Sequence, residues 1–358
     1  MNFIMKKILA YLLAAFMIIG SLGGCSSTAG TSAGKDGLSI VVTIFPEYDW
    51  VMNVLGDNPA GAEVTLLLNN GVDLHSFQPN ADDIMKIATC DLFIYVGGES
   101  DGWVDDALSE AVNKDMVVIN LLEELGDSVK EEEIVEGMQE EDEHDHEHHH
   151  DEDDDDEDEH HHDEDDDEHE HHHHDEDEVE YDEHVWLSLK NAVVITECIS
   201  DALQTIDPDN SSVYAGNCAD YTSELTALDK AYEEAVDNAS GNTLLFGDRF
   251  PFRYMTDDYD LNYYAAFVGC SAESEASFET ITFLSGKVDE LGLRCVLTIE
   301  GKDHSIAETI IQNTASKDQK ILTLDSMQSV TSADIANGVT YLSLMKENLE
   351  VLKEALSY

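Results

Sequence analysis

Apolar residues occur in short, nearly continuous runs over the first third of the chain. These runs are rich in Val, Ile and Leu and cover Leu38–Ile44, Glu63–Leu68, Asp91–Gly97 and Met116–Leu121. Such runs are typical of strands that are buried on both faces. Helix-like stretches lie between them, at Tyr48–Gly56, Pro79–Thr89 and Trp103–Asn113. Because strands alternate with helices, we expect a parallel α/β sheet.

The last third of the chain repeats this pattern. Four strand-like runs cover Asn242–Gly247, Leu261–Val268, Arg294–Ile299 and Lys320–Leu324. Helices are expected at Thr280–Leu291, Ile306–Ala315 and Gly338–Ala355. The fold class that follows is α/β with two similar lobes, each a four-stranded, mainly parallel sheet flanked by helices.

The middle of the chain predicts a long helix between the lobes. Leu187–Ile206 reads as one helix, Asp207-Pro208 interrupts it, and Asp209–Asp237 reads as a second with apolar residues three or four apart. At 1.5 Å per residue the second helix is about 40 Å long, enough to join two lobes. We expect an N-terminal lobe over 38–206, a linking helix over 207–240 and a C-terminal lobe over 241–358. Ligands of open α/β sheets bind beyond the carboxyl ends of the strands, so the cleft between the lobes is the expected site.

One segment changes this picture, because Glu140–Glu178 contains only Asp, Glu and His. It has 39 residues, 13 of them His and 26 acidic. With no apolar side chain to bury, it predicts the centre of a disordered insert over 131–180. Imidazoles and carboxylates are ligands of divalent transition metals, so the tract is expected to collect metal. Its histidines are His144, His146, His148, His149, His150, His160, His161, His162, His169, His171, His172, His173 and His174.

The tract contains the protease-like motif H-E-x-x-H twice, beginning at His146 and His169. That motif forms a zinc protease site only on a helix that packs in a folded domain. Here the flanking residues are almost all acidic, so both matches are attributed to chance in a biased segment. The rest of the sequence offers no convincing nucleophile–base pair. We therefore expect a protein that is not an enzyme.

The charge of the chain excludes nucleic acid as a partner. The net charge is −62, and the tract accounts for −26 of it, which leaves −36 elsewhere. Phosphate binding needs clustered Lys and Arg, which this chain lacks. Cations are the expected partners.

The N-terminus predicts export. Lys6 and Lys7 precede an apolar run, Ile8–Ile19, which is too short to span a bilayer but suits a signal peptide over 1–24. The following Leu22-Gly23-Gly24-Cys25 resembles the bacterial lipobox, which implies lipidation of Cys25; the alternative is an ordinary signal peptide with an incidental Cys. Residues 25–37 read as a flexible tether. We expect an extracytoplasmic protein that is lipid-anchored to the outer face of the bacterial cell membrane.

The other cysteines give little support for a thiolate site. There are five, an odd number, and none forms a C-x-x-C motif that would indicate a cysteine zinc site. Several lie in apolar runs and are interpreted as small buried side chains. They are Cys90, Cys198, Cys218, Cys270 and Cys295.

Only three histidines lie outside the tract: His75, His184 and His304. His75 follows a strand in a Gly-containing loop, and His184 stands at a helix start. Both are candidate ligands of a structured metal site. His304 begins a later helix, where a surface or capping role is expected.

Longer motifs around these histidines resemble a known family. Gly71-Val72-Asp73-Leu74-His75-Ser76-Phe77-Gln78-Pro79 resembles G-x-D-P-H-x-Y-E-P, and His184-Val185-Trp186-Leu187-Ser188-Leu189-Lys190-Asn191-Ala192 resembles H-x-W-L-D-P-x-N-A. Both patterns belong to the zinc/manganese solute-binding lipoproteins of ABC importers, the ZnuA/AdcA-like group. The resemblance covers roughly Ser39 to Leu356 and includes the start of the linking helix and the terminal helix. An acidic His-rich insert before the second His is typical of the zinc-importing members.

The resemblance also implies a third and a fourth ligand. The segment Gly247–Tyr254 matches the family's third-ligand motif and places Arg249 at the ligand position, where Arg cannot ligate. Asp248 is either the replacement ligand or only an ion-pair partner of Arg249. The fourth position, after the last strand, is occupied by Asp325, which is either a ligand or a turn cap. Glu300 is a reserve candidate. The predicted metal ligands are therefore His75, His184, Asp325 and Asp248.

The expected function is that of a monomeric receptor that captures extracytoplasmic Zn²⁺ and delivers it to an ABC importer, that is, to a permease and its ATPase. The His-rich insert favours Zn²⁺, whereas two imidazoles with two carboxylates are also compatible with Mn²⁺. Two alternatives stay open. One is a manganese receptor of the same family, and the other is a surface metal-buffering or adhesin lipoprotein without a transport role.

Overall fold

The computed structural model describes residues 37–139, 180–271, 275–301 and 303–357. The predicted signal peptide, Cys25, almost all of the tether and all the tract histidines lie outside the described residues. In the described part of the chain, no helix combines the length and the apolar character that a membrane span requires.

The N-terminal lobe is a four-stranded parallel sheet. Its strands are β1 (Ser39–Val42), β2 (Glu63–Leu66), β3 (Leu92–Tyr95) and β4 (Val117–Asn120), in the order β2-β1-β3-β4. Its helices are α2 (Phe45–Leu55), α3 (Ala81–Thr89), α4 (Val104–Ser109), α5 (Leu121–Leu125) and α6 (Leu189–Ile206). The four strands were predicted, and their apolar residues form the core, with Ile40, Val41 and Val42 completely buried. The helix predicted from Pro79 begins instead at Ala81, because Asn80 caps it by accepting from the backbone N–H groups of Asp82 and Asp83.

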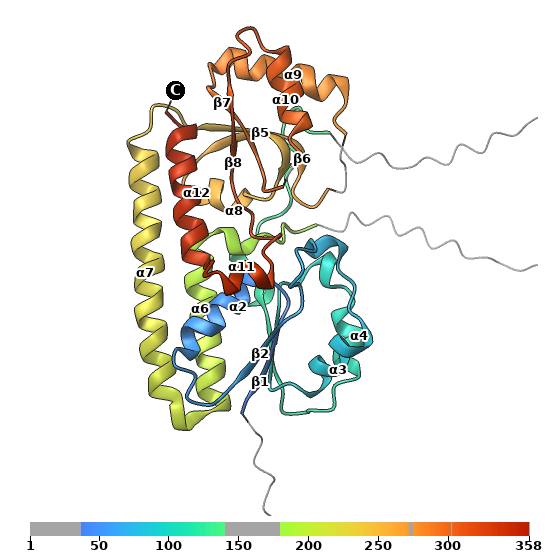
Figure 1. Ribbon diagram of the computed structural model, residues 1–358, viewed down its shortest axis with the longest axis vertical. Coiled ribbons are helices and arrows are strands. Elements are labelled where there is room, and N and C mark those ends of the chain that lie inside the picture. The colour runs from blue at the N-terminus through green and yellow to red at the C-terminus, as the bar shows by residue number, and fades with distance from the viewer. Residues whose placement is uncertain (1–36, 140–179, 272–274, 302, 358) are drawn as a thin grey trace, which may run out of the picture. The chain divides into compact units, whose positions relative to one another are not determined.

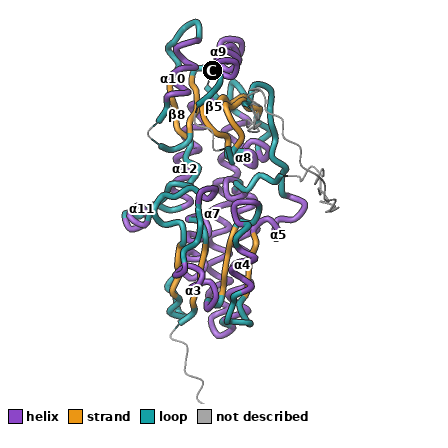
Figure 2. Tube along the Cα trace, turned by 90° about the vertical axis from the view of Figure 1, so that its right-hand side faces the viewer, coloured by secondary structure: helices purple, strands orange, loops and turns teal. Residues whose placement is uncertain are grey.

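The C-terminal lobe has the same topology. Its strands are β5 (Thr243–Phe250), β6 (Asn262–Val268), β7 (Cys295–Thr298) and β8 (Lys320–Thr323), all parallel, in the order β6-β5-β7-β8. Its helices are α8 (Arg253–Asp258), α9 (Phe278–Leu291), α10 (Ser305–Asn313), α11 (Ser332–Ala336) and α12 (Tyr341–Ala355). The strands of the two sheets form two separate sets in Figure 2. The prediction of two four-stranded lobes is confirmed, whereas the short helices α5, α8 and α11 were not predicted.

The long helix α7 (Ser211–Asp237) packs against both lobes. The Tyr221 hydroxyl donates to the Asp49 carboxylate on α2 at 3.0 Å, and the Tyr232 hydroxyl donates to the Met345 carbonyl on α12 at 2.6 Å. Figure 1 shows α7 and α12 side by side along the molecule. The predicted linking helix is therefore confirmed, and buried tyrosine hydrogen bonds attach it to each lobe.

The described residues just before and after the acidic tract are packed, although disorder was expected over 131–180. An isolated antiparallel bridge joins Glu131 to Tyr181, and the Gln139 N–H donates to the Ala266 carbonyl on β6 at 3.0 Å. Met138 is 8% exposed. Residues 131–139 therefore run from the N-terminal lobe onto the C-terminal lobe.

Candidate metal centre

The local structure around His75 fixes the orientation of its ring. Asp73 is the N-cap of a 3-10 turn, Leu74–Ser76, which is anchored by the buried side chain of Leu74. The Asp73 carboxylate accepts from the His75 backbone N–H at 3.1 Å and pairs with ring atom Nδ1 at 2.5 Å. Because an ionised carboxylate only accepts, Nδ1 carries the proton and Nε2 keeps its lone pair.

His184 repeats this arrangement in another segment. The Asp182 carboxylate accepts from the His184 backbone N–H at 2.8 Å and pairs with its Nδ1 at 3.0 Å. The next turn, Val185–Leu187, is fixed to the C-terminal lobe, because Trp186 Nε1 donates to the Ser326 carbonyl and the Tyr341 hydroxyl donates to the Trp186 carbonyl. His184 is completely buried. Its Nε2, like that of His75, is thus free to bind a metal.

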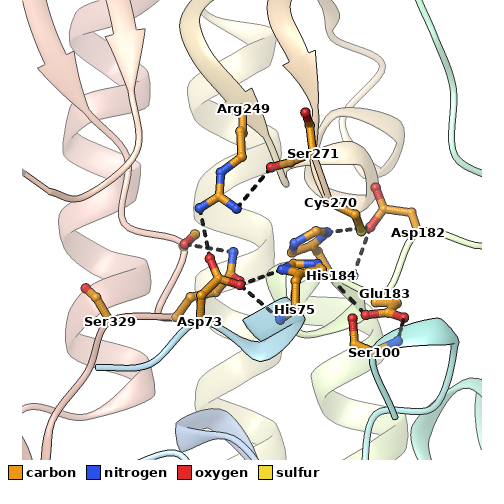
Figure 3. Close-up of polar contacts among 12 residues, drawn as sticks. Asp73, His75, Ser100, Asp182, Glu183, His184, Arg249, Cys270, Ser271 and Ser329 are labelled. Carbon is orange, nitrogen blue, oxygen red and sulfur yellow. Dashed lines mark hydrogen bonds and ion pairs between the residues drawn. The ribbon is translucent and has the colours of Figure 1, made fainter. Parts of the chain in front are cut away.

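The two imidazoles lie next to each other, and a cysteine lies beside them (Figure 3). Their ring centroids are 5.3 Å apart. The Nε2 atoms of both rings are buried without a hydrogen-bond partner. One ligand atom from each of His75, His184 and Cys270 lies within 4.8 Å of the other two, and this is the one such group found in the described part of the chain. A buried polar atom without a partner is costly, so two in one place indicate a site for a cation.

Glu183 places a carboxylate beside the His75 ring of this group. It is 2% exposed, its Oε1 accepts from the Ser100 backbone N–H at 2.8 Å, and its Oε2 has no hydrogen-bond partner. Oε2 lies 3.9 Å from His75 Nε2. A cavity of about 260 Å³ opens beside these atoms. Its lining includes His75, Cys270, Glu99, Glu132, Glu180 and Glu183. An acidic cavity of this kind attracts cations to the imidazoles.

The structure does not bring Asp248 into the group. A register shift in β5 between Phe246 and Arg249 surrounds Asp248, whose carboxylate accepts from the backbone N–H groups of Arg249 at 2.9 Å and Ile299 at 3.2 Å. The Arg249 side chain points to the site instead, where it pairs with the Asp73 carboxylate at 2.8 Å. Such a shift re-aims side chains, which strand position alone does not reveal.

Asp325 also lies outside the group, just past β8. Its carboxylate accepts from the Met327 backbone N–H at 2.8 Å, the turn-cap alternative considered for it. The reserve candidate, Glu300, accepts from the backbone N–H groups of Ser326, Gln328 and Ser329 and also lies outside the group. His304 occupies the N-cap of α10 without a side-chain capping bond.

Burial and neighbouring charges shift several ionisable groups at the site. Burial alone would raise the pKa of Asp73, but the hydrogen bond from His75 and the charges of His75 and Arg249 hold that pKa below its usual range. Burial, together with Asp182, Glu132 and Glu183, raises the pKa of the Cys270 thiol well above its usual range. Burial and Asp182 raise the pKa of Glu132 to about 7. The region is thus rich in negative charge that a divalent cation would offset.

Sequence reasoning missed Cys270 and Glu183 as members of the site. One signal was available for the histidines, because each has an Asp two residues before it, Asp73 or Asp182. Cys270 gave a weaker signal, its position two residues after a strand.

A family model described as ZnuA, "Zinc-uptake complex component A periplasmic", matches residues 40–355. The chain belongs to the ZnuA family. Members of this family are solute-binding proteins of ABC importers and not enzymes, in agreement with the predicted class.

Named relatives of this ZnuA-family chain are zinc proteins. It is 30% identical over 355 residues to the zinc-binding lipoprotein AdcA of Streptococcus pneumoniae serotype 4, covering 98% of this chain and 61% of AdcA. It is 26% identical over 343 residues to the high-affinity zinc uptake system protein ZnuA of Bacillus subtilis, covering 96% of this chain and 95% of that protein. The chain thus spans about three fifths of the length of AdcA and nearly all of the B. subtilis protein.

Solved structures show the same fold. The Zn(II)-bound ZnuA-like domain of S. pneumoniae AdcA has a TM-score of 0.64 at 25% identity, covering 90% of this chain and 100% of that domain. The B. subtilis lipoprotein YcdH has a TM-score of 0.66 at 22% identity, with the same coverage of each. The laminin binding protein Lmb of Streptococcus agalactiae, described as a bifunctional protein with adhesin and metal transporting activity, also shares the fold, with a TM-score of 0.65 at 20% identity. Fold alone therefore does not separate a receptor from an adhesin.

Proposed function

We propose that this ZnuA-family protein is an extracytoplasmic zinc receptor that holds one Zn²⁺ between its lobes and delivers it to an ABC importer. The observation that carries the proposal is that the Nε2 atoms of His75 and His184 have no hydrogen-bond partner. In each ring, an Asp carboxylate bonded to Nδ1 fixes the orientation. Carboxylate–histidine pairs of this kind orient the ligands of zinc sites. The zinc-binding names of the AdcA and ZnuA relatives support the choice of metal.

The ion is cargo, so the site must both bind and release it. The segment that carries His184 contacts the C-terminal lobe through Trp186, whereas the His75 loop belongs to the N-terminal lobe. A metal bound to both stabilises the arrangement in which the two segments are close together, by its differential affinity for that state. A permease that favours the other arrangement would release the ion.

We further propose that the protein acts as a monomer, anchored through lipidated Cys25, and that the tract over Glu140–Glu178 binds additional ions weakly. Glu180, two residues after the tract, supports this role, because it lines the acidic cavity and its carbonyl accepts from the Glu132 backbone N–H. Replacing the tract with a Gly/Ser linker should lower the total number of zinc ions bound and leave one tight ion. Loss of that last ion with the tract would support a metal buffer in place of a receptor.

Growth of a receptor-deficient bacterium at limiting zinc tests the transport role. The wild-type gene should restore growth together with its own permease and ATPase, and the His75→Ala/His184→Ala variant should not. His304→Ala is the matched control, because it removes a histidine that is outside both the tract and the site, and it should restore growth. Equal growth with the double variant would contradict the proposal. Rescue at limiting manganese rather than zinc would favour a manganese receptor.

A further inference from the structure

Cys270 differs from the other cysteines of the described residues in its surroundings. Cys218 and Cys295 are buried and donate to the backbone carbonyls of Thr196 and Ala355. Cys198, on α6, donates to the Glu124 carboxylate on α5. Cys270 follows β6 by two residues and lies with the two imidazoles in the one group of metal-binding side chains found in the described chain. Its surroundings are those of a ligand and not of a core residue.

A second observation points to a ligand at the same place. His184 is completely buried and Glu183 is 2% exposed, yet His184 Nε2 and Glu183 Oε2 have no hydrogen-bond partner. Glu183 Oε2 lies 3.9 Å from His75 Nε2, and Glu183 and Cys270 line the same cavity. Ligand atoms of two imidazoles and one cysteine therefore lie within 4.8 Å of one another, and the Glu183 carboxylate lies beside one of these imidazoles.

We propose that Cys270, as a thiolate, is a direct ligand of the zinc ion, and that Glu183 completes a four-ligand set with His75 and His184. The inference rests on the proposed function and names the ligands of that same site. Arg249 lies where the family resemblance implied a third ligand and is paired with Asp73, so the cysteine supplies the donor that Arg249 cannot.

The geometry is compatible with a tetrahedral ion. Zn–N bonds of about 2.0 Å and a Zn–S bond of about 2.3 Å place ligand atoms about 3.3 to 3.6 Å apart. The group of His75, His184 and Cys270 lies within 4.8 Å, so an arriving ion needs to draw its members together by only about 1 Å. Binding is accompanied by release of the thiol proton to water as the Zn–S bond forms.

A thiolate also accounts for metal choice. Sulfur and imidazole donors select zinc, whereas manganese prefers carboxylate, carbonyl and water ligands. With Cys270 in the set, the site should bind Zn²⁺ and reject Mn²⁺. Cd²⁺, a softer ion, should compete with zinc.

X-ray absorption at the zinc edge and Co²⁺ substitution test the ligand directly. The full chain from Ser26 onward, loaded with one equivalent of metal, should show a zinc–sulfur shell at about 2.3 Å and a thiolate-to-Co²⁺ charge-transfer band. The acidic tract contains no cysteine, so it cannot produce either signal. This wild-type measurement needs no variant and is therefore independent of any folding defect.

Variants assign the signal to one residue. Cys270→Ser should remove both signals and weaken zinc binding by at least about tenfold, the loss that even outer-shell partners cause. Cys198→Ser, the matched control at a half-buried cysteine outside the site, should keep the signals and the affinity. Tight zinc binding that depends on His75 and His184 but shows no sulfur shell would overturn the role of Cys270 and leave the receptor proposal standing. Absence of any histidine-dependent tight zinc would overturn the receptor proposal itself.

Discussion

On the N-terminal side of the site, the carboxylates of Asp73 and Asp182 each accept a hydrogen bond from an imidazole, and the far nitrogen of each ring is left free. On the C-terminal side, the carboxylates of Asp248 and Asp325 accept from backbone N–H groups of their own lobe. All four are acidic side chains, yet only the first pair holds an imidazole whose other ring nitrogen has no partner. The difference teaches that proximity to a strand end does not make a ligand, whereas a free lone pair held in place does.

The two lobes nevertheless contribute from equivalent places in their sheets. β2 and β6 are the second strands of their lobes, each at the sheet edge beside the first strand. His75 lies in the loop that follows β2, and Cys270 directly follows β6. Because parallel strands direct their carboxyl ends to one edge, the shared topology brings one proposed donor from each lobe to the acidic cavity.

Among substitutions that keep the proposed ligands, the largest effect is expected from breaking a carboxylate–histidine pair. Asp182→Asn removes the charge that fixes the His184 ring, so the zinc dissociation constant should rise on the order of 10- to 100-fold. Competition with a chelator measures it. Asp303→Asn is the control, because Asp303 also accepts a backbone N–H, from Ser305, but outside the site. If Asp182→Asn left the zinc affinity unchanged, the carboxylates of the N-terminal side would not prepare a metal ligand any more than those of the C-terminal side do.

A smaller effect is expected at the ion pair between the lobes. Arg249→Gln removes the partner of Asp73, whose side chain is 25% exposed, but keeps the bond from Asp73 to His75. Partly exposed ion pairs contribute little, so zinc affinity should change by less than about tenfold. Calorimetric titration of zinc into the wild type and this variant compares them. A loss as large as that of Asp182→Asn would show that Arg249 itself organises the site.

The smallest effect on zinc is expected at Asp325, with a separate effect on stability. Burial and the nearby charge of Glu300 raise the pKa of Asp325 from 3.8 to about 7 in the folded protein. The folded state thus holds a proton that the unfolded state loses, and stability falls as pH rises from about 4 through 7. Asp325→Asn should therefore flatten the decline of Tm between pH 5 and 8 and leave zinc affinity within about twofold. A large loss of zinc affinity in Asp325→Asn would show that Asp325 is a metal ligand, as predicted from the sequence.

Much of the fold could be predicted from the sequence, and the site only in part. The central strands β1, β3, β5 and β7 are mostly buried and so produce continuous apolar runs, and the tyrosine-rich face of α7 repeats at a helical period. His75 and His184 could be proposed as ligands because they are two of only three histidines outside the tract. Asp248 was predicted as a ligand but lies outside the group, because a register shift in β5 decides where its side chain points. Cys270 was interpreted as a buried side chain but lies in the group, because the packing of the residues after β6 decides where its side chain points. Neither leaves a periodic trace in the sequence.

Zinc competition titrations of two paired variants test the central claim most directly. His75→Ala/His184→Ala removes the donors of the N-terminal side, and Asp248→Asn/Asp325→Asn removes the carboxylates of the C-terminal side. The first variant should lose the single tight zinc ion and keep only weak binding by the tract, and the second should bind that ion as the wild type does. Loss of the tight ion in the second variant, with retention in the first, would contradict the account.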